Sequence, residues 1–178
     1  MRKWNAILSA LLIAVFLLHG VIGGFLLLGV GKGEANFLAW IGCGLIAIHV
    51  AFGVMFTVQA IRSGKASGKW YLRQNALFWA RRISGVCILV LAFFHFRLFG
   101  AEEGGRYVLF EFTTLRLIVQ LLLTAALFTH IFMNIRPLLV SFGILKYKKR
   151  RVDIYIIVSV ALLFCTYATI FYYVGWLS

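Results

Sequence analysis

The chain is short, apolar and basic: 178 residues, of which 63% are hydrophobic and 13% charged, with a mean hydropathy of +0.97 and a formal net charge of +13. This composition excludes an ordinary soluble domain and predicts an integral membrane protein. We expect residues 1–178 to form a single membrane domain, which leaves no room for a soluble catalytic domain.

Five apolar segments follow one another along the chain, each near the roughly 20 residues that a helix needs to cross about 30 Å of hydrocarbon. They cover residues 5–30, 36–61, 75–98, 112–135 and 153–176. Open strands would leave backbone groups unpaired in lipid. The first run is too long for a secretory signal, so we interpret it as a span. The sequence therefore predicts an all-α bundle of five transmembrane helices.

The basic residues predict how this bundle is oriented. They concentrate at the N-terminus and in the second and fourth loops, whereas the opposite side has only Lys32, Arg97, Arg106 and Arg116, together with glutamates. The positive-inside rule then places the N-terminus in the cytoplasm and the C-terminus outside. In so apolar a chain, we expect the basic face to meet anionic lipid or an acidic partner protein and no nucleic acid.

Four histidines, His19, His49, His95 and His130, lie one in each of the first four apolar segments. An ionisable side chain inside a membrane helix is costly and usually functional. A single histidine could be a structural residue that hydrogen-bonds to a neighbouring helix. Four in this pattern favour metal ligation, because neutral imidazole is a common metal ligand and two imidazoles can fill both axial positions of a haem iron. The four would then hold two haems.

The charged helix ends give approximate depths for two of these histidines. His95 lies two residues before Arg97, and His130 lies six residues before Arg136, which is about 9 Å by helix rise. His95 and His130 therefore cannot share one haem, while spacing alone leaves the pairing of His19 and His49 open.

Polar and charged residues near the helix ends are candidates for contacts with haem propionates or a quinone, or alternatively interfacial anchors. They are Ser9, Trp79, Arg81, Arg82, Arg97, Arg116 and Arg136. Glycines also flank two histidines, with Gly20, Gly23 and Gly24 after His19. They would admit either a flat macrocycle or a closely packed helix.

The whole chain resembles the dihaem cytochrome b subunit of succinate dehydrogenase and fumarate reductase. The resemblance rests on the histidine placement, on the RRISG motif that contains Arg82, Ser84 and Gly85, and on the later FH that contains His95. The chain is somewhat shorter than is usual for that family, mainly through shorter loops.

This resemblance implies a multi-pass anchor in a bacterial cell membrane that binds a flavoprotein subunit and an iron–sulfur subunit on the cytoplasmic side. Carried over by helix, His49 and His130 would ligate a proximal haem b, and His19 and His95 a distal one. Electrons would pass to or from menaquinone in the membrane, and the same architecture serves succinate oxidation and fumarate reduction.

Quinone chemistry moves protons as well as electrons, so its site needs an acid or a base. Glu34, in the first outer loop, is the candidate, because some family members have an acidic residue in this region; the alternative is a solvated loop carboxylate. Some fumarate reductases of the family also have a glutamate two residues before the fourth-helix histidine, where this chain has Phe128. That departure argues against a proton path of this kind here.

Two other readings stay open at this point. One is a haem b anchor for another membrane oxidoreductase, such as a hydrogenase or formate dehydrogenase, although those anchors often place two histidines on one helix. The other is a non-haem ion or proton carrier that uses the histidines as a relay. Relays commonly use carboxylates as well, and here the only ones near the spans are Glu111 and Asp153 at their ends.

Overall fold

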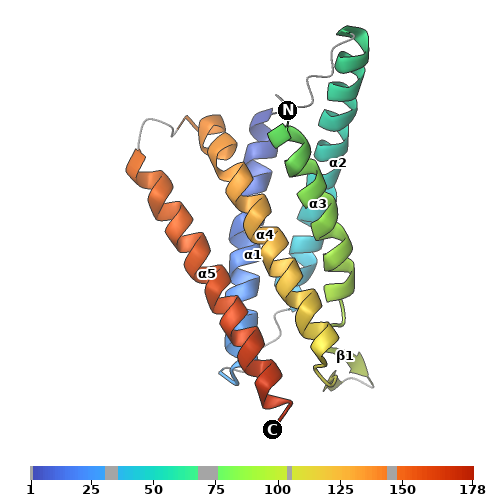
Figure 1. The fold of residues 1–178 in the computed structure, drawn as a ribbon, viewed down its shortest axis with the longest axis vertical. Coiled ribbons are helices and arrows are strands. Elements are labelled where there is room, and N and C mark those ends of the chain that lie inside the picture. The colour runs from blue at the N-terminus through green and yellow to red at the C-terminus, as the bar shows by residue number, and fades with distance from the viewer. Residues whose placement is uncertain (1, 31–35, 68–75, 104–105, 144–147) are drawn as a thin grey trace.

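The computed structural model describes residues 2–30, 36–67, 76–103, 106–143 and 148–178, which form five long helices and one short hairpin (Figure 1). All five helices are long and apolar enough to cross a membrane, so the predicted helical membrane fold is confirmed. The elements are α1 (Arg2–Leu27), α2 (Asn36–Ser67), α3 (Ala76–His95), β1 (Gly100–Glu103), β2 (Arg106–Leu109), α4 (Thr114–Ser141) and α5 (Lys148–Gly175).

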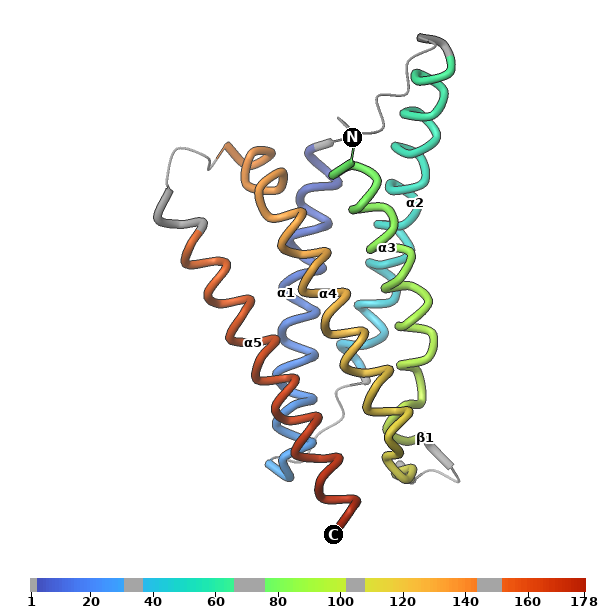
Figure 2. The backbone as a smooth tube through the Cα atoms, in the orientation of Figure 1, coloured from blue at the N-terminus to red at the C-terminus, as the bar shows by residue number. Residues whose placement is uncertain are grey.

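The chain termini lie at opposite ends of the bundle, as five successive crossings require (Figure 1). We call these ends the N-terminal end and the C-terminal end. The most extensive helix contacts are between α3 and α4, followed by those of α1 with α5 and with α2 and those between α4 and α5. In the described part of the chain, α2 has extensive contact only with α1, and Figure 2 shows it along one edge of the bundle.

The buried core lies between α4 and α5. Ile135 and Val158 are each only 1% exposed, and they pack with Ile131, Leu139 and Leu162. Ile13 and Leu17 of α1 pack against the same cluster. Many other large apolar side chains are exposed, as expected for helices whose outer faces meet lipid.

Two glycines allow α1 to approach α5 closely. A Cβ added at Gly24 would lie 2.6 Å from Cε1 of Phe164, and one added at Gly20 would lie 3.0 Å from Sγ of Cys165. A Cβ added at Gly23 would meet nothing within 4 Å. Gly20 and Gly24 are four residues apart and therefore share one helix face, which is the small-residue spacing typical of close packing in membranes.

The α1 helix ends at a glycine in the left-handed conformation. Gly29 has φ +74°; its N–H donates to the carbonyl of Leu26 at 3.0 Å, and the N–H of Val30 donates to that of Phe25 at 2.9 Å. This pair of bonds is a Schellman motif, which satisfies carbonyls that have no partner inside the helix.

Four helices extend beyond the expected apolar spans, α1 and α5 at their starts and α2 and α4 at their ends. The α2 helix reaches Ser67, and α4 reaches Ser141 with Pro137 inside it. Proline has no N–H, so the carbonyl of Met133, four residues earlier, loses its usual helical donor. Nε of Arg81 donates to that carbonyl at 3.1 Å. A side chain of α3 thus replaces the missing backbone bond of α4.

A hairpin that was not predicted from the sequence connects α3 and α4. Its strands β1 and β2 are antiparallel, with Gly100 paired to Leu109 and Glu103 to Arg106. A Gly-Gly dipeptide between two such segments is a typical two-residue hairpin loop, and this signal in the sequence could have revealed the hairpin.

Candidate functional site

The four histidines meet in two pairs inside the bundle. His19 of α1 and His95 of α3 have ring centroids 6.3 Å apart, and their ring planes are at 84° to each other. Both side chains are largely enclosed by neighbouring helices. Because His95 is the last residue of α3, this pair lies toward the C-terminal end of the bundle.

The second pair lies deeper toward the N-terminal end. His130 of α4 has His49 of α2 close enough for their charges to interact, together with Arg81 and Arg82 of α3. Among the described residues, no three side chains of the types His, Cys, Asp and Glu gather at one place. The histidines therefore form two pairs, one nearer the N-terminal end of the bundle and one nearer the C-terminal end.

The α3–α4 histidines each form a side-chain hydrogen bond through Nδ1. Nδ1 of His130 lies 2.9 Å from the hydroxyl of Ser84, and Nδ1 of His95 lies 2.8 Å from Oε1 of Gln120. The α1–α2 histidines differ, because Nδ1 of His19 and Nδ1 of His49 are buried without a hydrogen-bond partner in the described structure.

The geometry of His19 and His95 fits axial ligation of one iron. A metal–imidazole bond of about 2 Å on each side, plus roughly 1 Å from each nitrogen to its ring centre, separates the two centroids by about 6 Å. The observed separation is 6.3 Å. The donor set therefore fits haem.

Arg82, a cation near the second pair, has one guanidinium nitrogen without a hydrogen-bond partner among the described residues. Its Nε is buried without a hydrogen bond, and its guanidinium lies 4.8 Å from the ring centroid of Phe78. The nearest group to a Cβ added at Gly53 of α2 would be Nη1 of Arg82, at 3.8 Å. Arg82 as a whole is half-buried, and a partly desolvated cation is stabilised by a nearby counter-charge. A ligand with carboxylates, such as the haem propionates, would supply one.

The other candidates from the sequence have local partners or are exposed. The hydroxyl of Ser9 donates to the carbonyl of Asn5 in its own helix, and Trp79 contacts Phe78 edge-on. Nη1 of Arg116 donates to the carbonyl of Leu98, 2.9 Å away. The remaining three are Arg97, exposed with φ +59° at the end of α3; Arg136, exposed on α4; and Glu34, outside the described residues.

Gln120 is the site residue that the sequence analysis missed. It lies on α4, ten residues before His130, and its side chain reaches His95 on α3. A single amide in the apolar run LRLIVQLLL was the available signal, because polar side chains inside membrane helices usually have a partner within the bundle.

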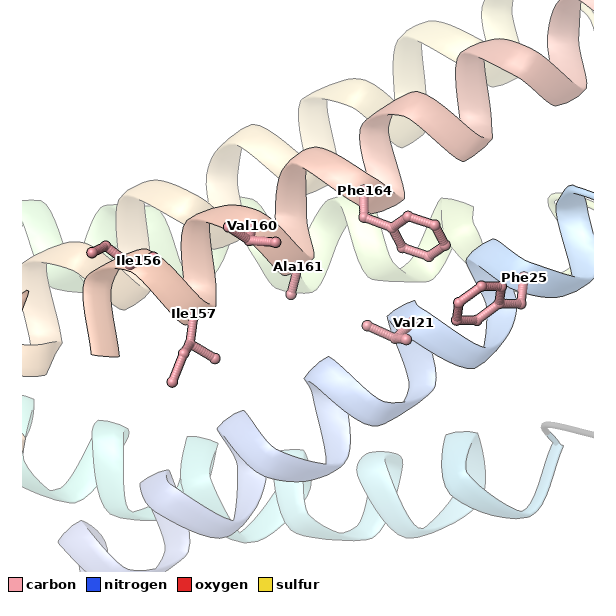
Figure 3. A pocket seen from close by; sticks show the side chains of 7 residues that line it. All are labelled: Val21, Phe25, Ile156, Ile157, Val160, Ala161 and Phe164. Carbon is pink, nitrogen blue, oxygen red and sulfur yellow. The ribbon is translucent and has the colours of Figure 1, made fainter. Parts of the chain in front are cut away.

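A groove lined by residues of α1 and α5, with no histidine among them, is shown in Figure 3. It has a volume of about 430 Å³, and its lining is entirely apolar: Val21, Phe25, Ile156, Ile157, Val160, Ala161 and Phe164. These side chains offer no hydrogen-bond partner to a quinone headgroup. The groove suits hydrocarbon chains.

Comparison with known proteins identifies a family. The family model described as "Succinate dehydrogenase/Fumarate reductase transmembrane subunit" matches residues 67–170, more than half of the chain. This range contains α3 and α4, with His95 and His130, and most of α5. No curated protein and no solved structure gives a significant match.

Proposed function

Because the chain belongs to the family of succinate dehydrogenase/fumarate reductase transmembrane subunits, we propose that it is a dihaem cytochrome b anchor that passes electrons between an iron–sulfur subunit and menaquinone. The observation that carries this proposal is the pairing of four intramembrane histidines at two depths. Haem iron, when bound, supplies a one-electron carrier at each depth.

In this proposal His49 and His130 are the axial ligands of the haem near the N-terminal end, and His19 and His95 those of the haem near the C-terminal end. The 6.3 Å centroid separation of His19 and His95 supports the second assignment. His49 lies close enough to His130 for their charges to interact, which supports the first. Since α2 packs extensively only against α1, His49 faces its partner across a sparsely packed part of the bundle.

Arg82 has two roles in this scheme. It binds a haem carboxylate through its guanidinium, and its positive charge favours the reduced state of the nearby haem. Phe78 covers one face of this guanidinium at 4.8 Å, which holds it in a partly desolvated position where a charge-assisted hydrogen bond is strong.

The N-terminal end of the bundle is the cytoplasmic face on which we propose that the iron–sulfur and flavoprotein subunits dock. Its basic loops, which give the chain most of its positive charge, favour this orientation in a bacterial cell membrane. The quinone headgroup then reacts toward the opposite side, where Glu34 is our candidate proton donor and acceptor.

The variant His130→Ala tests this function in the assembled complex. We expect loss of the haem held by His49 and His130 and loss of quinone-linked succinate turnover, while dye-linked turnover by the soluble subunits persists. Thr129→Ala is the matched control, because Thr129 is exposed, adjoins His130 and donates only to a carbonyl of its own helix. Quinone-linked turnover that survives His130→Ala would refute the ligand assignment.

A further inference from the structure

Ser84 fixes which nitrogen of His130 carries the proton. Its hydroxyl donates to the carbonyl of Arg81 at 3.1 Å, so its single hydrogen is already used. The same oxygen lies 2.9 Å from Nδ1 of His130 and can then only accept. When Ser84 forms both bonds, Nδ1 is the protonated nitrogen, and the lone pair of this imidazole is on Nε2.

Gln120 likewise determines which nitrogen of His95 carries the proton, but through an amide oxygen instead of a hydroxyl. The atom 2.8 Å from Nδ1 of His95 is Oε1, an amide oxygen that can only accept. Nδ1 of His95 is again the donor, and Nε2 again has the lone pair. Within the described residues, neither His95 nor His130 has a hydrogen bond through Nε2.

Resting on the haem-binding function proposed above, we infer that Ser84 and Gln120 are positioning residues. Each sets the tautomer of one haem-ligating histidine and, through it, the reduction potential of that haem. Ser84 acts through His130 and Gln120 through His95. The acceptor that faces Nδ1–H orients the ring, presents Nε2 to the iron and raises the basicity of the ligand. A more basic imidazole stabilises the ferric state and lowers the potential.

The two residues act on separate haems because their histidines belong to separate pairs. His95 pairs with His19, whereas His130 has His49 as its neighbour. The chain thus has an independent control at each depth: a hydroxyl on α3 at one and an amide on α4 at the other. Both bonds bridge α3 and α4, the helix pair with the most extensive contact.

Redox titration of the whole complex, followed in the visible spectrum, tests this inference through the potential of each haem. Ser84→Ala should raise only the potential of the His49/His130 haem, and Ser84→Thr, which keeps the hydroxyl, should restore it. Gln120→Leu should raise only the potential of the other haem. Gln120→Glu should lower that potential, because a carboxylate is a stronger acceptor than an amide.

Haem retention gives a second readout that does not depend on activity. Loss of the acceptor should weaken binding of the affected haem by about 10- to 100-fold, the usual effect of removing a partner of a metal-bound histidine, measured as the rate of transfer to excess apomyoglobin. Thr124→Val and Thr129→Val are the controls, because both hydroxyls donate to carbonyls of α4 itself. Neither control should change either potential.

The outcomes distinguish failure of this inference from failure of the proposed haem-binding function on which it rests. Ser84→Ala and Gln120→Leu proteins that keep two haems with unchanged potentials would overturn the inference and leave the haem-binding function standing. A shift of the same haem by both variants would overturn the assignment of one residue to each haem. Unmodified protein that binds no haem would overturn both the function and the inference.

Discussion

The two halves of the bundle hold their histidines differently. On α3 and α4, His95 and His130 are each fixed by a side chain of the facing helix, Gln120 and Ser84 respectively. On α1 and α2, Nδ1 of His19 and Nδ1 of His49 are buried with no partner in the described structure. Each histidine pair thus combines one ring held by the protein with one that is not.

This difference suggests how the bundle would hold the two haems that we propose with few polar side chains. The α3–α4 half is the fixed side, tied also by the bond from Arg81 to the carbonyl of Met133. In the proposed function, the α1–α2 half would supply the second ligands from helices that pack through small and apolar side chains. We expect haem binding to order the rings of His19 and His49, whose Nδ1 atoms have no hydrogen-bond partner among the described residues.

The largest expected effect is the loss of one whole haem. His49→Ala and His130→Ala should remove the same haem, and His19→Ala and His95→Ala the other, because each iron needs both axial ligands for stable low-spin binding. Haem content and the visible spectrum of the four purified variants measure this. If His19→Ala and His49→Ala instead removed the same haem, the two histidines of the α1–α2 half would ligate one iron, and the proposed pairing across the two halves would be wrong.

A smaller effect is expected at Arg82, on the fixed side. Arg82→Ala should weaken binding of the His49/His130 haem by about 1.5–3 kcal/mol, the contribution of a hydrogen bond to a charged group. Arg136→Ala is the matched control, since Arg136 is an exposed arginine of the neighbouring helix. Haem loss during detergent washing measures both. Equal effects of the two variants would show that Arg82 contacts no haem carboxylate.

The smallest effect concerns how α1 is held. Gly24→Ala should lower stability by about 1 kcal/mol, the low end for overpacking, because the new methyl group would lie 2.6 Å from the ring of Phe164, which can turn aside. Gly23→Ala should cost nothing sterically, since its Cβ meets open space. Thermal unfolding of the two variants compares them. Greater damage from Gly23→Ala would place a ligand against that glycine.

Most of the fold follows from hydropathy alone. An apolar segment of about 20 residues in lipid satisfies all its backbone hydrogen bonds by forming a helix, so five such segments predicted five helices. The ends were less predictable, because α2 continues to Ser67 and α4 to Ser141, past the last apolar turn. Pro137 illustrates why: a side chain far away in sequence, that of Arg81, compensates for the missing donor.

The site was only partly predictable for a similar reason. The histidines stand out individually because polar residues are rare in these segments, yet their pairing depends on how four helices pack. The spacing of His19 and His49 from charged helix ends did not reveal it. The partner of His95, Gln120, depends equally on a contact between α3 and α4. The glycines after His19 had two readings, and Gly20 and Gly24 lie against α5.

The central claim is that the four histidines hold two b haems, and a pyridine haemochrome assay with a reduced-minus-oxidised visible spectrum of the purified protein tests it most directly. Our account predicts two haems b per chain with two separable contributions to the spectrum. One haem per chain would mean that one histidine pair is structural. Protein without haem would contradict the account and favour an ion or proton carrier built on the same histidines.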